Sequence, residues 1–149
     1  VKLARPNQQV ICLAGDGSFI FGPTALWNMA RLQLPVITVV YNNHAYGGPH
    51  SRVINNVPSG RMVQTGQFVH DYLGNPDMDM ASIAKGFGVD GEVVHNPAQL
   101  KEALARARRH TVEGKPYLLD VQTARKGVGW VQNPWVPPIR VAELRTKKV

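Results

Sequence analysis

Two polar residues of the chain, Asp16 and Asn43, have side chains that could together hold a metal ion. Asp16 lies between two glycines after the apolar run 10–14, and Asn43 follows a second apolar run, residues 36–41. A carboxylate, an amide oxygen and a backbone carbonyl from the next loop form an incomplete octahedron of the oxygen ligands that Mg²⁺ prefers. Phosphate oxygens and water usually complete such a site. The two residues therefore predict a magnesium ion that joins the protein to a diphosphate group.

The residues around Asp16 are also suited to a phosphate group. Gly15 and Gly17 permit a tight turn and a close approach of the backbone to a ligand. The backbone amides of Gly17, Ser18 and Phe19 are expected to point at an anion at the start of a helix. Taken singly, Asp-Gly is an ordinary turn signal and Asn-Asn an ordinary loop signal, so the joint occurrence carries the prediction.

The chain between the two residues predicts a strand, a helix and a second strand. Residues 10–14 and 36–41 have the continuous apolar character of buried parallel strands. Residues 23–32 have helical spacing, with Pro23 in the first turn and Pro35 closing the helix. Such crossovers are right-handed in ~98% of cases, so both strands end on the same side of the sheet. Open α/β sheets bind their ligands at that edge.

The rest of the chain predicts a continued alternation of helices and strands. Further elements are expected at a helix that begins after Asp79 and ends at Gly86 or Gly88, a strand at 91–95, a helix at 97–110 capped by Asn96, and a strand at 116–122. Residues 44–77 are expected to be a long irregular connection, and no element is clear from Lys126 onward. The predicted fold class is α/β, a parallel sheet with helices on both faces.

The spacing of the two site motifs resembles a known signature. GDGS at 15–18 and YNN at 41–43 are separated so that 24 residues lie between Gly17 and Asn42, which resembles the diphosphate-binding signature of thiamine-diphosphate-dependent enzymes. The segments MDMASIAKGFGV and PYLLDVQT also resemble the C-terminal domain of that superfamily, which includes acetolactate synthases, benzoylformate and pyruvate decarboxylases and 2-hydroxyacyl-CoA lyases. The resemblance covers residues 1–124 and leaves residues 125–149 as a tail. It implies the thiamine-diphosphate-binding fold.

The resemblance implies roles for individual residues. Mg²⁺ would be bound by the side chains of Asp16 and Asn43 and by the backbone carbonyl of Ala45. Other residues would lie near the diphosphate of the cofactor: Gly15, Gly17, Ser18, Tyr46 and Gly47. Some relatives have a hydroxyl residue in place of Ala45, but a backbone ligand tolerates that difference.

No catalytic residue is identified. In the superfamily a glutamate activates the cofactor, and it lies on a separate pyrimidine-binding domain, usually of a neighbouring subunit. This chain has no Asp or Glu between Gly17 and Asp71. The bulky apolar residue that bends the cofactor normally lies further upstream than the 15 residues that precede Asp16. We therefore expect a diphosphate-binding domain that is incomplete at its N-terminus and belongs to a longer, cleaved or split enzyme.

The function implied by the resemblance is that of a lyase or carboligase. The reaction would be decarboxylation, or cleavage or formation of a carbon–carbon bond, on a 2-oxo acid or 2-hydroxyacyl substrate. Its partners would be a pyrimidine-binding domain or chain in a homo- or hetero-oligomer. The alternative is a non-catalytic cofactor-binding or regulatory subunit of such an enzyme.

The histidines near the predicted cofactor loop and the tryptophans of the tail each have two interpretations, whereas Cys12 has one. His44 and His50 flank the predicted cofactor loop and are either acid/base groups on the substrate side or simply solvated. Trp130 and Trp135 in the tail either close over a pocket or pack on a neighbouring subunit. Cys12 lies in an apolar run and is expected to be a packed thiol.

The excess of basic over acidic residues is confined to the last third of the chain. The net charge is +7, but residues 1–100 hold six basic and six acidic groups, against eleven basic and four acidic groups in residues 101–149. Lys101, Arg106, Arg108 and Arg109 fit the solvated face of a helix, and no nucleic-acid-binding motif accompanies them. Binding to nucleic acid is therefore disfavoured. With no apolar run of ~20 residues and no signal peptide pattern, a cytoplasmic protein that does not enter membranes is expected.

Overall fold

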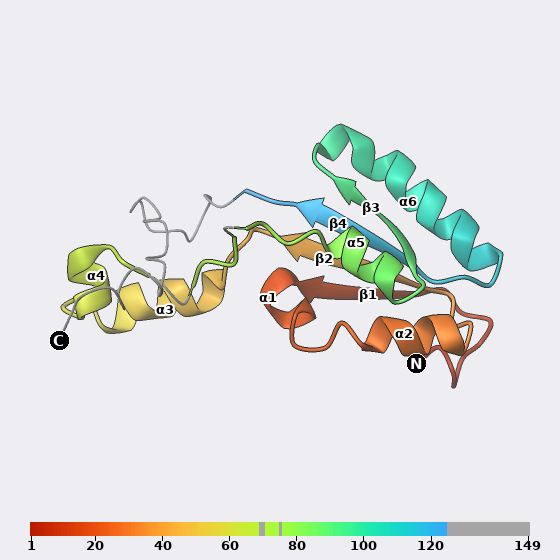
Figure 1. The fold of residues 1–149 in the computed structure, drawn as a ribbon, viewed down its shortest axis with the longest axis horizontal. Helices are drawn as coiled ribbons and strands as arrows, with labels where there is room; N and C mark the ends of the chain where they lie inside the picture. The colour runs from red at the N-terminus through yellow and green to blue at the C-terminus, as the bar shows by residue number, and fades with distance from the viewer. Residues whose placement is uncertain (69–70, 75, 125–149) are drawn as a thin grey trace, which may run out of the picture. The chain divides into compact units, whose positions relative to one another are not determined.

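The computed structural model describes residues 1–68, 71–74 and 76–124, and these residues belong to two compact units. The first unit consists of residues 1–43 and 78–123 and contains the sheet. The second consists, in the described part, of residues 44–77 and residue 124. Figure 1 shows the sheet with its helices, and the two helices of the second unit. No helix in the described part of the chain is long and apolar enough to cross a bilayer.

The first unit is built on a four-stranded parallel sheet. Its strand order is β1-β2-β4-β3, and every neighbouring pair is parallel. The strands are β1 (Val10–Gly15), β2 (Val36–Asn42), β3 (Asp90–Val94) and β4 (Tyr117–Gln122). All four strands predicted from the sequence are confirmed, and so is the α/β class with a parallel sheet.

The two faces of the sheet are covered by different helices. Along β2 and β4, even-numbered residues such as Val40 and Leu118 pack in one apolar layer with α1 (Asp16–Phe19), α2 (Ala25–Arg31) and α5 (Met80–Gly86). Odd-numbered residues such as Val39 and Leu119 pack in a second layer against α6 (Pro97–Val112). This alternation follows from the two-residue period of a strand. The prediction of helices on both faces is confirmed (Figure 1).

The predicted N-caps of the last two helices are confirmed. The Asn96 side chain accepts a hydrogen bond from the Ala98 amide at 2.9 Å, and the Gln99 side chain accepts one from the Asn96 amide at 3.2 Å. At α5 the Asp79 carboxylate accepts from the Ser82 amide at 2.8 Å and from the Ser82 hydroxyl at 2.6 Å. These side chains satisfy amides that have no partner inside the helix.

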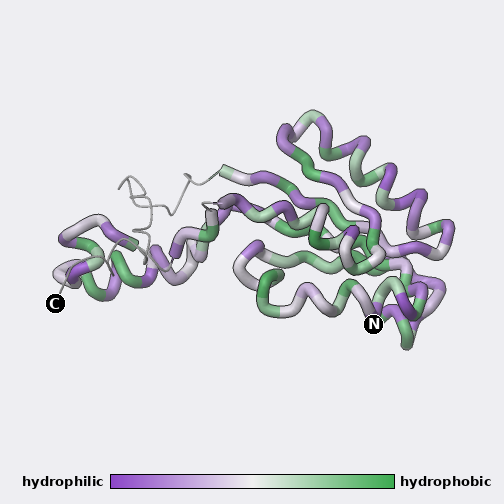
Figure 2. Tube along the Cα trace, viewed as in Figure 1, coloured by the Kyte–Doolittle hydropathy of each residue, from purple (hydrophilic) through white to green (hydrophobic). Residues whose placement is uncertain are grey.

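The prediction that β1 is a buried strand is wrong. Ile11 is 51% exposed and Leu13 62% exposed, and the Cys12 thiol is exposed rather than packed. β1 is an edge strand of the described sheet and pairs only with β2. Its apolar character, green in Figure 2, is the same as that of a central strand. An apolar run therefore predicts a strand but does not reveal the number of its neighbours.

The second unit is more regular than predicted. In place of an irregular connection it contains α3 (Gly47–Asn56) and α4 (Arg61–Thr65). The sequence Gly47-Gly48-Pro49 suggested a loop, but it opens α3, because a proline in the first turn of a helix sacrifices no internal hydrogen bond. Gly66 ends α4 in the left-handed conformation, with a φ of 66°. The predicted tail with Trp130 and Trp135 lies outside the described residues.

Candidate functional site

Asp16 and Asn43 follow the last residues of two adjacent strands. β1 ends at Gly15 and β2 at Asn42, and the Cα register pairs Gly15 with Tyr41. Both residues therefore lie at the carboxyl edge of the sheet, on strands that are parallel neighbours. Adjacent strands lie about 4.8 Å apart, so one bound ion can be reached from both.

A single turn of helix begins at Asp16. The start of a helix was expected near Gly17, but the helix itself was predicted only from Pro23; the structure has a separate turn, α1, followed by α2 from Ala25. Asp16 is 4% exposed, and its Oδ1 accepts a hydrogen bond from the Gly17 amide at 2.7 Å. The Gly17 amide was expected to face a bound anion; in the structure it donates to the Asp16 carboxylate and orients it. A Cβ built at Gly15 would meet no heavy atom within 4 Å, so the backbone there is open to a ligand.

The end of β2 is supported by β4. Asn42 is 1% exposed, and its carbonyl accepts a hydrogen bond from the Thr123 amide at 2.8 Å. That bond extends the pairing of the two strands to the residue before Asn43, which is itself half-buried. The backbone that presents Asn43 is therefore anchored in the sheet.

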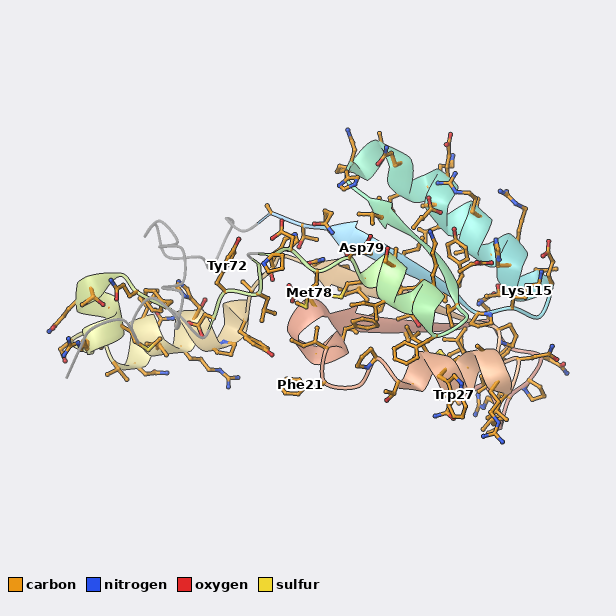
Figure 3. The ribbon with its side chains drawn as sticks, viewed as in Figure 1. Phe21, Trp27, Tyr72, Met78, Asp79 and Lys115 are labelled. Atoms are coloured by element: carbon orange, nitrogen blue, oxygen red, sulfur yellow. The ribbon has the colours of Figure 1, made fainter. Side chains whose placement is uncertain are left out.

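Ala45 and Tyr46 lie in the second unit, on a short backbone bridge. Ala45 forms an isolated antiparallel bridge with Tyr72, which Figure 3 labels. The Tyr46 amide donates to the Asp71 carbonyl at 2.7 Å, and the Leu73 amide donates to the His44 carbonyl at 2.8 Å. Gly47 then begins α3, so the predicted cofactor loop is shorter than the sequence suggested.

His44 and His50 each lie close to a carboxylate. His50 Nδ1 lies 3.3 Å from Asp71 Oδ2, and the two side chains are only 2% and 8% exposed. The interpretation of His50 as a solvated loop residue is therefore wrong. His44 Nδ1 lies 3.4 Å from Asp77 Oδ1. Sequence reasoning missed the pairing of His50 with Asp71, because 21 residues separate them and no local pattern joins them.

A strongly raised pKa is found at the amino-terminal ends of the strands, away from Asp16 and Asn43. Tyr117 is the first residue of β4, and burial raises the pKa of its hydroxyl to about 12. Its hydroxyl donates to Glu92 Oε1 at 3.1 Å, and Arg106 donates to both carboxylate oxygens of Glu92, at 2.9 and 2.6 Å. The hydrogen bond from Arg106 is the main cause of the lowered pKa of Glu92. Arg106, predicted on a solvated helix face, is thus part of a structural ion pair.

The donors at the two strand ends fit a magnesium ion that also binds phosphate. Within the described residues no three His, Cys, Asp or Glu side chains gather as metal ligands. One carboxylate and one amide oxygen do not complete a metal shell by themselves. Mg²⁺ is commonly held by one or two carboxylates together with substrate phosphates and water, and this donor set matches that pattern.

Comparison with known proteins identifies the fold and its family. Residues 1–121 match the family described as "Thiamine pyrophosphate enzyme, C-terminal TPP binding domain". The chain is 32% identical over 124 residues to a benzoylformate decarboxylase of Pseudomonas aeruginosa, a match that covers 82% of this chain and 21% of that protein. It is 36% identical over 121 residues to a putative acetolactate synthase large subunit of Mycobacterium tuberculosis, covering 80% and 22% respectively.

A solved structure gives the same result. The thiamine diphosphate-dependent 4-hydroxybenzoylformate decarboxylase of Rhodococcus jostii superposes with a TM-score of 0.69 at 31% identity, covering 84% of this chain and 21% of that one. The chain thus spans about one fifth of the length of each of these relatives. It belongs to the thiamine pyrophosphate enzyme family and corresponds to the C-terminal TPP binding domain of that family.

Proposed function

We propose that this chain binds Mg²⁺ and the diphosphate of thiamine diphosphate at the carboxyl edge of its sheet. The metal ligands would be the side chains of Asp16 and Asn43 and the backbone carbonyl of Ala45. The observation that carries the proposal is the position of Asp16 and Asn43 after the ends of two adjacent parallel strands, in a chain of this family. Ligands of open α/β sheets bind at that edge.

The neighbouring residues would support the diphosphate rather than the metal. The backbone at Gly15 is open to an approaching phosphate, and the Gly17 amide holds the Asp16 carboxylate in place. Ser18 is exposed at the same edge, one residue further along α1. Tyr46 and Gly47, at the start of α3, would contribute from the loop that carries Ala45.

The chain would serve as part of a lyase or transferase. The proposed reaction is decarboxylation, or formation or cleavage of a carbon–carbon bond, on 2-oxo acids or 2-hydroxyacyl substrates. The relatives named decarboxylase and acetolactate synthase support this class. Thiamine diphosphate supplies an electron sink for such reactions, while the protein supplies binding and orientation. A pyrimidine-binding domain or chain, an oligomer and a cytoplasmic location stay predictions.

Substitution of Asp16 tests the metal site. In the full chain, Asp16→Ala is expected to abolish Mg²⁺-dependent retention of thiamine diphosphate, measured by isothermal titration calorimetry with and without Mg²⁺. Asp16→Asn should weaken it less, because the amide keeps one oxygen donor. Glu92→Gln is the matched control for Asp16→Asn. It also changes a carboxylate of the first unit to an amide, but Glu92 lies in β3, which pairs with neither β1 nor β2. Unchanged cofactor affinity in Asp16→Ala would overturn the assignment.

A second measurement separates the enzyme from the regulatory alternative. Hydrogen–deuterium exchange at C2 of the bound cofactor, read by NMR after acid quench, reports activation of the cofactor directly. If the chain is part of an enzyme, exchange should become fast when a pyrimidine-binding domain is present in the same assembly. Tight binding without faster exchange in that assembly would favour a non-catalytic cofactor-binding subunit.

A further inference from the structure

The loop that carries Ala45 is held in place by residues that lie far from it in the sequence. Asp71 contacts this loop through its backbone and contacts α3 through its side chain. We propose that His50 and Asp71 are positioning residues, which fix the direction of the Ala45 carbonyl and so set the affinity of the site for Mg²⁺. This inference rests on the proposed function, in which that carbonyl is a metal ligand.

The direction of the Ala45 carbonyl follows from one hydrogen bond. The Ala45 carbonyl and the Tyr46 amide belong to the same peptide group, which is planar, and in a trans peptide they point in opposite directions. The Tyr46 amide donates to the Asp71 carbonyl at 2.7 Å. The Ala45 carbonyl is therefore directed away from the segment that contains Asp71. Loss of this bond would free the peptide group to rotate.

The peptide group before it, between His44 and Ala45, is held by the same segment. The Leu73 amide donates to the His44 carbonyl at 2.8 Å, which completes the bridge between Ala45 and Tyr72. His44 itself has a φ of 55°, in the left-handed region that non-glycine residues rarely adopt. A backbone in this conformation persists only where the surrounding contacts hold it. The bridge supplies two of those contacts.

The side chains of Asp71 and His50 connect the bridge to α3. His50 Nδ1 lies 3.3 Å from Asp71 Oδ2, and the His50 amide donates to the Tyr46 carbonyl at 3.0 Å. The His50 ring also packs against Phe68, with 4.1 Å between the ring centroids. Asp71 thus holds the Tyr46 amide with its carbonyl and α3 with its carboxylate. Because both side chains are buried, water cannot readily replace this hydrogen bond.

Two substitutions isolate the side-chain contact. His50→Phe keeps a ring against Phe68 but removes the nitrogen that faces Asp71, whereas His50→Asn keeps a nitrogen donor near the position of Nδ1. Asp71→Asn replaces the carboxylate that faces His50 by an amide, and it leaves the Asp71 backbone carbonyl in place to accept from the Tyr46 amide. Glu92→Gln again serves as the control for loss of a carboxylate elsewhere in the protein, at β3.

The primary measurement is the Mg²⁺ concentration for half-saturation at saturating thiamine diphosphate, on the full chain. Loss of a residue that orients a metal ligand typically weakens metal binding about 10- to 100-fold. We expect His50→Phe and Asp71→Asn to show a rise of that size, His50→Asn a smaller one, and Glu92→Gln none. Amide hydrogen exchange of the apo protein is the second measurement. Tyr46 and Leu73 should exchange faster in His50→Phe than in the wild type.

The possible outcomes separate the two proposals. If all variants bind Mg²⁺ as the wild type does, or if Glu92→Gln weakens binding as much as they do, the positioning role is overturned while the metal site stands. If the amides of Tyr46 and Leu73 exchange at the wild-type rate in His50→Phe, the side-chain pair does not hold the loop, and the inference also fails. If the wild type shows no Mg²⁺-dependent cofactor binding, the proposed function itself is overturned, and the role of the pair with it.

Discussion

His44 combines an unfavourable backbone conformation with a close contact to a carboxylate. Its φ of 55° crowds the Cβ atom against the backbone, while its ring lies 3.4 Å from the Asp77 carboxylate. For an L-residue other than glycine, this left-handed conformation costs roughly 1–2 kcal/mol. The two effects act in opposite directions on the free energy of unfolding, and they can be separated by substitution.

We expect His44→Ala to be less stable than His44→Gly, by about 1 kcal/mol. Both variants lose the contact with Asp77, but only glycine relieves the backbone strain. The measurement is the urea midpoint of unfolding, with the signal of the second unit followed by NMR. Equal midpoints for the two variants would show that the backbone at this position relaxes.

The Tyr117 hydroxyl makes stability depend on pH in the alkaline range. Burial raises its pKa to about 12 in the folded protein, whereas a tyrosine in the unfolded chain titrates near 10. The folded state therefore holds a proton that the unfolded state loses. This contribution is fully present below about pH 10 and is lost as the pH rises toward 12.

Tyr117→Phe should remove that part of the pH dependence. The variant is expected to be less stable at pH 8, because the hydrogen bond to Glu92 is lost, and to lose less stability than the wild type between pH 10 and 12. Urea unfolding at several pH values measures both effects. Parallel pH profiles for the two proteins would contradict the assignment.

At the scale of elements, α5 depends on its N-cap. The two hydrogen bonds from Ser82 to Asp79 satisfy the start of a helix that has only seven residues. They are also the main cause of the lowered pKa of Asp79. A lowered pKa means that the stabilisation is present above the ordinary value near 3.9 and is lost as the pH falls through the folded-state value.

Asp79→Ala is expected to reduce the free energy of unfolding by about 1 kcal/mol at pH 7. Asp79→Asn should retain most of the stability, because an amide oxygen can also cap a helix. Chemical denaturation at pH 7 and pH 3 gives the comparison. The difference between wild type and Asp79→Ala should shrink at pH 3, and a constant difference would contradict the pKa argument.

At the scale of the whole molecule, the two units differ in how much they bury. The first unit has an apolar layer on each face of its sheet. Among the described residues of the second unit only four are buried: Ala45, His50, Phe68 and Asp71. Segments with few buried contacts open more readily than the core of a domain. The second unit should therefore be cleaved first by a protease.

Trypsin provides a matched comparison. Arg52 and Arg61 in the second unit are exposed, and so are Arg31 and Lys85 in helices of the first unit. We expect cleavage after Arg52 and Arg61 well before cleavage after Arg31 and Lys85, with Mg²⁺ and thiamine diphosphate slowing the first pair. Mass spectrometry of the digest at successive times is the measurement. Simultaneous cleavage at all four sites would mean that the two units open together.

The sequence alone determined the parts of this protein that depend on local patterns. Apolar runs located all four strands, cap residues located the starts of α5 and α6, and the GDG and NN spacing placed Asp16 and Asn43 at the ends of adjacent strands. Each of these features depends on residues within one turn, one strand or one crossover. Pattern reasoning works at that range because backbone geometry sets the periods.

Only the tertiary structure decided the features that depend on distant residues. The burial of a strand depends on its neighbours, so the apolar sequence of β1 did not reveal that Ile11 and Leu13 are exposed at an edge. The partner of a side chain depends on chain return, so the contact of His50 with Asp71 had no sequence signal. The same holds for the Tyr46 amide, whose partner sets the direction of the Ala45 carbonyl. Contacts between residues far apart in the sequence form only when the fold brings them together.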